Sequence, residues 1–477
     1  MRVSEYFGLG RTQPSLDFVD VDIEGDTRVF IDPRALRLLP SKWGDECVSL
    51  IQNFFKTILL AIRDGQNDRA KALLRVLREP NETHLGLSIG KARGRGLGYE
   101  SAVDVWQALS ESEAVRTGLL EDLEDTILLI EGISSDIISD MTTNIIRGPL
   151  IKYTQERANY YGIPVTEEID SGPLWDPAHK EWYSELVSLP MTDSGKLLLV
   201  PKAIVRRRME YDYDEYYRHY LLVYLSELEL KANTELVRLL KDGRRKVHKK
   251  DLKEKYGSGK KVLIRETLKY PEILQRYRRD KRKQYRPPLD HYEISESEGS
   301  PSPDWDALIA NVLAIPVGHA HFGDYEKAVE SLLTALFYPF LTNPQVQLEI
   351  HEGRKRIDIT YTNMGTHGFF GWLAQHYTAP HVFIECKNYG SELGNPELDQ
   401  MAGRFSPSRG QFGIIVCRGF ADKKLFTKRC RDTANDNRGF IIPLDDSDLI
   451  QLTRASKEDP DFYNFYLLKK RFDELVM

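Results

Sequence analysis

Arg356–Tyr361, RIDITY, and His381–Lys387, HVFIECK, are the two stretches that decide the fold of the last third of this chain. Side chains two positions apart share one face of a β-strand. In the first stretch Asp358 therefore lies opposite the isoleucines and the tyrosine, and in the second Glu385 and Lys387 share a face. If the strands are neighbours, these three charged side chains converge on one patch. Charges on apolar strands destabilise a fold unless they are paired or hold a metal.

The surrounding sequence predicts a central sheet covered by helices. Tyr325–Phe340 is expected to form a helix, because its apolar residues recur on one stripe at helical spacing. The pattern predicts further strands at Val346–Ile350, Gly413–Cys417 and Gly439–Leu444, and helices at Pro396–Phe405 and Lys423–Thr433. Strands and helices in this order indicate an α/β domain with a central sheet and helices on both faces.

The residue types in the patch suit metal-assisted phosphodiester hydrolysis. Asp358 and Glu385 supply the hard oxygen ligands that Mg²⁺ prefers. Such an ion lowers the pKa of a bound water and offsets charge on the scissile phosphate. Lys387 lies beside the same site, where an ammonium group orients the water or stabilises the transition state.

Asp358 followed by IECKN at Ile384–Asn388 resembles the signature of the PD-(D/E)XK phosphodiesterase superfamily, and the nearest similarity is to Mrr-like restriction endonucleases. The segment YEKAVESLL, at Tyr325–Leu333, looks like the first helix of that family. Its acidic residue matches Glu326, with Glu330 one turn later as the alternate. The resemblance extends from Asp324 to Leu449, about a quarter of the chain, and Ile357 stands where the pattern's name has proline.

The resemblance implies a restriction-endonuclease-like fold with a mixed sheet, a Mg²⁺ ion with Mn²⁺ as a substitute, and hydrolysis of DNA. It also matches Gln400, in ELDQMAGRF, to a glutamine that the family often carries. The implied catalytic residues are Glu326, Asp358, Glu385, Lys387 and Gln400, and the implied metal ligands are Asp358, Glu385 and Glu326. The setting it implies is bacterial defence against foreign DNA, with a homodimer and a companion defence protein as expected partners. An inactive nuclease fold that only binds nucleic acid, and a nuclease for RNA or repair intermediates, remain open.

Length and composition indicate several globular domains. The chain has 477 residues, 41% hydrophobic and 29% charged, which predicts two to four domains. We expect a mainly helical sensor or regulatory domain at 1–165, a basic helical region at 166–300 that ends in a linker at Glu293–Pro303, and the nuclease-like domain at 301–477. Neither a signal core nor a membrane-length apolar run is visible, and the four cysteines lack metal-clip spacing, so we expect a cytoplasmic protein.

Charge is distributed unevenly along the chain. The formal net charge is −6, yet Lys231–Arg286 is strongly basic and interleaves tyrosines with its cations. This combination suits phosphate contact and base stacking, so DNA is the expected partner. The candidate nucleic-acid-binding residues are Arg244, Arg245, Lys246, Arg278, Arg279, Arg282 and Lys283. A solvated helical face is the alternative interpretation of such a charge run.

Overall fold

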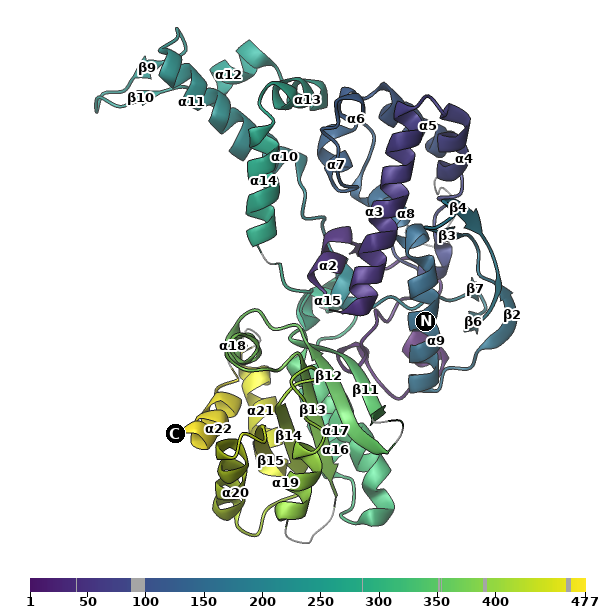
Figure 1. The fold of residues 1–477 in the computed structure, drawn as a ribbon, viewed down its shortest axis with the longest axis vertical. Helices are drawn as coiled ribbons and strands as arrows, with labels where there is room; N and C mark the ends of the chain where they lie inside the picture. The colour runs from purple at the N-terminus through teal and green to yellow at the C-terminus, as the bar shows by residue number, and fades with distance from the viewer. Residues whose placement is uncertain are drawn as a thin grey trace.

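The computed structural model describes residues 1–39, 41–86, 99–284, 286–350, 352, 354–388, 393–459 and 465–477. Two large hydrophobic cores and one small cluster organise these residues; the small cluster consists of Ile151, Leu174, Leu189 and Leu198. The first contains buried side chains from Val3 to Ile294, together with Tyr338, and the second runs from Trp305 to Leu475. The division between the cores falls near residue 300. Figure 1 shows the corresponding N-terminal unit above the C-terminal unit. Among the described residues, no helix is both long and apolar enough to cross a membrane.

The N-terminal unit is built mainly from helices, as the sequence indicates. They are α1 (Val3–Tyr6), α2 (Pro33–Leu38), α3 (Lys42–Arg63), α4 (Asn67–Leu74), α5 (Tyr99–Glu111), α6 (Glu113–Thr117), α7 (Asp125–Leu129), α8 (Ser135–Ile145) and α9 (Arg147–Tyr161). The longest, α3, begins where the Ser41 hydroxyl accepts a hydrogen bond from Gly44 N at 3.1 Å. This contact satisfies one of the free N–H groups of the first turn.

Short strands follow α9, where the sequence analysis expected a helical middle region. They are β2 (Thr166–Asp170), β3 (Leu174–Asp176), β4 (Glu181–Tyr183), β5 (Leu186–Leu189), β6 (Met191–Thr192), β7 (Gly195–Lys196) and β8 (Val205–Arg206). A further short strand, β1 (Phe30–Ile31), precedes α9 in the chain. These strands form the antiparallel pairs β1–β8, β2–β5, β3–β4 and β6–β7. Turns every few residues keep these strands too short for the hydrophobic periodicity on which the expectation rested.

A basic arm follows and projects from the side of the N-terminal unit, above the C-terminal unit (Figure 1). Its elements are α10 (Tyr213–Glu215), a π-helical segment (Tyr216–Leu221), α11 (Leu222–Ala232), β9 (Arg238–Leu239), β10 (Arg245–Lys246), α12 (Lys249–Tyr256), α13 (Lys260–Lys269) and α14 (Glu272–Lys283). The predicted linker at Glu293–Pro303 is partly helical, because α15 (His291–Glu298) covers its first six residues and buries Ile294 and Ser295.

The C-terminal unit has a five-stranded mixed sheet between two layers of helices, as predicted. Its helices are α16 (Trp305–Leu313), α17 (Phe322–Phe337), α18 (Gly368–His376), α19 (Asn395–Ala402), α20 (Lys423–Asn435), α21 (Asp446–Glu458) and α22 (Tyr466–Val476). Its strands are β11 (Leu341–Ile350), β12 (Lys355–Asn363), β13 (His381–Lys387), β14 (Phe412–Cys417) and β15 (Phe440–Asp445), in that spatial order. Helices α16, α17 and α21 pack together, and α18, α19, α20 and α22 form the other layer (Figure 1).

The register of this sheet aligns the two strands that carry the charged residues. β11, β12 and β13 are antiparallel neighbours, whereas β13, β14 and β15 run parallel. Ile359 pairs with Ile384 across β12 and β13, so one further step of this register sets Asp358 opposite Glu385. The predicted helix at Tyr325–Phe340 ends earlier, at Phe337, because Pro339 follows and cannot donate a helical hydrogen bond.

Polar contacts join the two units. Arg11 Nη2, in the N-terminal unit, lies 2.5 Å from Glu330 Oε2 on α17. Arg157 Nη1, on α9, donates a hydrogen bond of 2.8 Å to the carbonyl of Pro344 on β11. The N-terminal unit thus contacts the strand at the edge of the sheet.

Candidate active site

The structure brings Asp358, Glu385 and Lys387 together on one side of the sheet. Asp358 Oδ2 accepts a hydrogen bond of 2.9 Å from the backbone N of Cys386. Lys387 Nζ donates to Glu385 Oε1 at 2.9 Å. All three side chains are buried, and burial raises the pKa of Asp358, an effect that the Cys386 N–H and nearby cations oppose. The patch therefore concentrates charge in a largely desolvated place.

Gln400 also reaches this patch. It lies on α19, and its Oε1 accepts a hydrogen bond from Lys387 Nζ at 3.4 Å. The lysine ammonium is consequently held between Glu385 and Gln400. Two of its three N–H groups have partners, which fixes the position of the charge.

Glu326, on α17, approaches the patch from the neighbouring helix. Gln347 Nε2, on β11, donates to both carboxylate oxygens of Glu326, at 3.0 and 2.9 Å. Burial raises the pKa of Glu326 to about 7; the Gln347 hydrogen bond opposes this shift, and the negative charge of Asp358 adds to it. Mutual repulsion of this kind is relieved when a cation enters between two carboxylates.

Glu330, the alternate acidic residue of the same helix, is engaged elsewhere. Arg11 Nη2, from the N-terminal unit, lies 2.5 Å from Glu330 Oε2, and Thr334 Oγ1 donates to Oε1 at 2.8 Å. Glu330 is 0% exposed. The geometry therefore favours Glu326 over Glu330 as the acidic residue beside Asp358.

Sequence reasoning missed Arg404, which belongs to the same patch. Arg404 follows α19, is 5% exposed, and forms an ion pair with Oε2 of Glu385. Burial lowers its pKa, and the negative charge of Asp358 opposes that change. The sequence carried one signal for a second cation in the patch. Three acidic candidates and a single lysine leave a net negative charge, which a buried site must balance.

The donor types of the patch fit a hard divalent cation, because Glu326, Asp358 and Glu385 offer only carboxylate oxygens. Their positions are less favourable. Within the described residues, no group of three or more His, Cys, Asp or Glu side chains is arranged to hold a metal ion. Glu385 turns toward Lys387 and Arg404, whereas Glu326 and Asp358 remain close to Gln347. A metal at this patch would require Glu385 to exchange a cationic partner.

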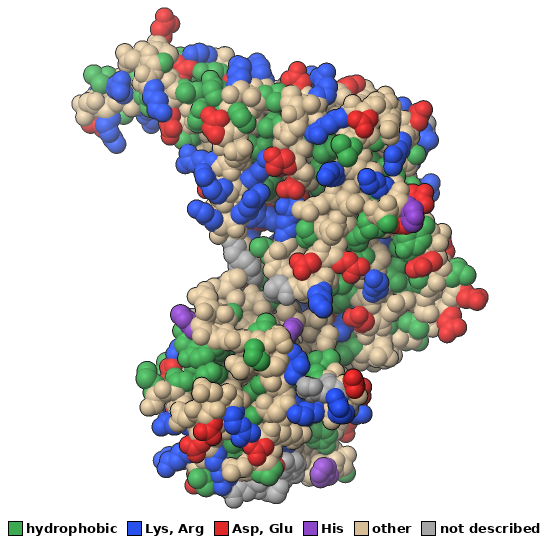
Figure 2. All heavy atoms as spheres, viewed as in Figure 1, with side chains coloured by type: hydrophobic (Ala, Val, Ile, Leu, Met, Phe, Trp, Pro, Cys, Tyr) green, Lys and Arg blue, Asp and Glu red, His purple; other side chains and the backbone are tan. Residues whose placement is uncertain are grey.

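Most of the candidate nucleic-acid contacts are exposed on the arm. The exposed cations among them are Arg244, Arg245, Lys246, Arg279, Arg282 and Lys283. In Figure 2, blue Lys and Arg side chains gather along the inner edge of the arm, above the C-terminal unit. Arg278 is the exception. It is 5% exposed and lies 2.5 Å from Asp125 and 2.9 Å from Glu121, so it holds the arm to α7 rather than facing solvent.

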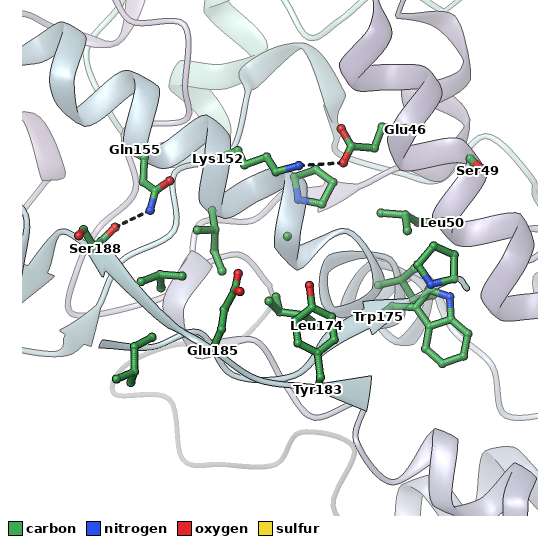
Figure 3. A pocket seen from close by; sticks show the side chains of 17 residues that line it. Glu46, Ser49, Leu50, Lys152, Gln155, Leu174, Trp175, Tyr183, Glu185 and Ser188 are labelled. Carbon is green, nitrogen blue, oxygen red and sulfur yellow. Dashed lines mark hydrogen bonds and ion pairs between the residues drawn. The ribbon is translucent and has the colours of Figure 1, made fainter. Parts of the chain in front are cut away.

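A cavity of about 710 Å³ lies away from this patch. It separates α3 and α9 from strands β3, β4 and β5 (Figure 3). Leu50, Leu174 and Trp175 give it an apolar lining, and its ion pair, Glu46 with Lys152 at 3.2 Å, is exposed. It thus lacks the buried cluster of charges found between β12 and β13.

The family match found by comparison with known proteins lies outside the patch. A model of the family described as Domain of unknown function (DUF8370) matches residues 8–212. The matched segment begins after α1 and ends just before α10, so it covers α2 to α9 and the short strands β1 to β8 but neither the arm nor the five-stranded sheet. No curated protein and no solved structure matches the chain.

Proposed function

We propose that residues 301–477 form a PD-(D/E)XK-type nuclease domain that hydrolyses DNA phosphodiester bonds with Mg²⁺. The observation that carries the proposal is the convergence of Asp358 on β12 with Glu385 and Lys387 on β13. Glu326 approaches the same place from α17 through Gln347. Five strands in the mixed order described above agree with a restriction-endonuclease-like fold.

In the proposed reaction Asp358 and Glu385 would hold the ion, and Glu326 would complete its shell through water. A bound Mg²⁺ supplies a water of lowered pKa and offsets charge on the phosphate. Lys387 keeps its ammonium at the end of β13, 3.4 Å from Gln400, where it would orient the attacking water. The same ammonium would stabilise negative charge that develops on the phosphate oxygens.

The arm is the proposed DNA-contacting surface. Arg279, Arg282 and Lys283 are exposed on α14, and Arg244, Arg245 and Lys246 are exposed around β10. Contacts from such residues to phosphates carry most sequence-independent affinity for nucleic acid. The overhang of the arm above the C-terminal unit suits a duplex that contacts both (Figure 1). We expect a defence role, and a homodimer for cutting both strands.

A cleavage assay tests the proposal directly. Supercoiled plasmid, linear duplex, single-stranded DNA and RNA would each be incubated with the protein in Mg²⁺, Mn²⁺ or EDTA. Asp358→Ala and Lys387→Ala should abolish metal-dependent cutting. Asp432→Ala and Lys424→Ala are matched controls, because they remove the same residue types from α20, away from the patch, and should cut like the wild type.

A second candidate function is nucleic-acid binding by an inactive nuclease fold. The observation that favours it is that Glu385 has a cation on each of its carboxylate oxygens. No cutting of any substrate, combined with DNA binding that is lost when the arm cations are removed, would replace the nuclease proposal with this one. Cutting of RNA alone would instead change the substrate class.

A further inference from the structure

Arg404 places a guanidinium on a carboxylate that the proposed reaction needs for its metal. Arg404 forms an ion pair with Oε2 of Glu385, and Lys387 Nζ donates to Oε1 at 2.9 Å. Glu385 is 1% exposed, so water does not compete for these oxygens. Cations therefore occupy both oxygens of Glu385.

A divalent cation and the Arg404 guanidinium compete for the same oxygen. Arginine stays protonated throughout the physiological pH range, so this competitor does not leave by losing a proton. It must move for Glu385 to become a metal ligand. Arg404 lies just beyond the C-terminal end of α19, which ends at Ala402, so its displacement need not break the helix.

The charge balance indicates what would draw the guanidinium away. Three carboxylates, from Glu326, Asp358 and Glu385, face two cations, from Lys387 and Arg404. With all three ionised, the patch carries one net negative charge, and a divalent cation converts this to one net positive charge. A phosphodiester, which carries one negative charge, would restore neutrality. The planar guanidinium also matches two phosphate oxygens at once.

We propose that Arg404 is a built-in competitor of the metal at Glu385, and that it moves to a phosphate oxygen when nucleic acid enters the site. This inference rests on the proposed function, because it takes Asp358 and Glu385 as the metal site. Metal and nucleic acid then bind with positive cooperativity, since each removes an interaction that disfavours the other. The protein would hold its metal weakly until substrate arrives.

Mn²⁺ binding, followed by the electron paramagnetic resonance signal of free Mn²⁺, tests this inference without any cleavage measurement. Arg404→Gln removes the competing charge and should tighten Mn²⁺ binding in the absence of DNA by about tenfold, the size of a typical coupling between two ligands. Arg438→Gln is the matched control. It removes an exposed arginine that pairs with Asp399, on α19 itself, at 2.7 Å, and it should leave Mn²⁺ affinity unchanged.

The wild-type protein offers a second measurement that does not depend on the folding of a variant. Its Mn²⁺ affinity should rise when a short DNA duplex is added on ice, with duplex integrity checked on a gel. Asp358→Asn, titrated with the same duplex, subtracts the Mn²⁺ that DNA binds by itself. Arg404→Lys keeps the charge but cannot bind two phosphate oxygens side by side, so it should retain weak Mn²⁺ binding and show little of the increase with DNA.

The outcomes separate this inference from the proposed function. Equal Mn²⁺ affinity in the wild type and Arg404→Gln, with binding lost in Asp358→Asn, would overturn the role of Arg404 and leave the metal site standing. Mn²⁺ binding that is unaffected by DNA in the wild type would also overturn it. Indistinguishable titrations of the wild type, Arg404→Gln and Asp358→Asn would remove the metal site itself, and both proposals with it.

Discussion

Arg11 Nη2 lies 2.5 Å from Glu330 Oε2, and this ion pair connects the beginning of the chain to the helix that carries Glu326. Burial works against the charge on Arg11, but Glu330 reverses that effect, so the pKa of Arg11 is raised overall. Both partners lie between the units, where the pair is shielded from solvent.

The pair should matter for stability. Arg11→Ala leaves Glu330 as a buried charge without its cation, which typically costs about 3–5 kcal/mol. Arg207→Ala breaks an exposed pair with Glu296 and should cost about 0–1 kcal/mol. Thermal unfolding measures both, and the double variant Arg11→Ala/Glu330→Gln should recover part of the loss. Equal melting temperatures for Arg11→Ala and Arg207→Ala would contradict this expectation.

Glu326 and Glu330, both on α17, should affect different properties of the protein. Glu326→Gln removes the carboxylate beside Asp358 and should weaken Mn²⁺ binding by roughly 10–100-fold, as changes around a metal site commonly do. Glu330→Gln should lower the melting temperature with little change in Mn²⁺ affinity, because Glu330 is bound to Arg11. Mn²⁺ titration and thermal unfolding of the two variants side by side make the comparison. A reversed result would reassign the acidic ligand to Glu330.

Acid should destabilise the contact between the two units through His291. This side chain donates through Nε2 to the carbonyl of Ala335 at 2.8 Å, and burial together with the charge of Lys202 lowers its pKa to about 3. The unfolded state then binds a proton that the folded state excludes, so stability falls as the pH drops from 6.5 toward 3. The loss between pH 7 and pH 5 should be about 2 kcal/mol.

His291→Gln tests this pH dependence, because glutamine has no group that titrates in the window. The melting temperature of this variant should fall less between pH 7 and pH 5 than that of the wild type. His219→Gln, at an exposed position on the arm, is the control and should keep the wild-type slope. Equal slopes for His291→Gln and the wild type would assign the acid sensitivity to other groups.

Substitutions of exposed cations on α14 should weaken DNA binding, whereas substitution of a buried one should lower stability. Arg279→Ala, Arg282→Ala and Lys283→Ala combined should weaken DNA binding for all sequences and reduce the salt slope by about 1 for each phosphate that is no longer neutralised. Arg278→Ala should instead lower the melting temperature, since Asp125 then remains buried without its partner. Fluorescence anisotropy at several salt concentrations, with thermal unfolding alongside, measures both effects. Unchanged salt dependence in the triple variant would remove α14 from the proposed DNA surface.

The strand pattern was sufficient to predict which charged residues meet in the sheet. Side chains alternate with a period of two along a strand, so the shared face of Asp358, Glu385 and Lys387 follows once β12 and β13 are neighbours. The position of Gln347 could not be predicted in this way. Its backbone has φ 51°, in the left-handed region that non-glycine residues rarely adopt, and it follows a register shift in β11.

Interactions between distant segments account for the other differences. Arg404 reaches Glu385 only because α19 packs beside the sheet, and nothing in MAGRF specifies that packing. Arg278 was predicted to contact nucleic acid, but it is buried. Its partners, Asp125 and Glu121, lie more than a hundred positions earlier, and local periodicity carries no information about them.

The junction between the units also has a consequence for biosynthesis. Arg11 and Arg157 are translated long before their partners Glu330 and Pro344. Domains tend to fold in the order in which they leave the ribosome. The surface that receives α17 and β11 is therefore available while the nascent sheet is still incomplete. The last third of the chain therefore folds against a unit that is already folded, and β11 and α17 contact their partners as soon as they leave the ribosome.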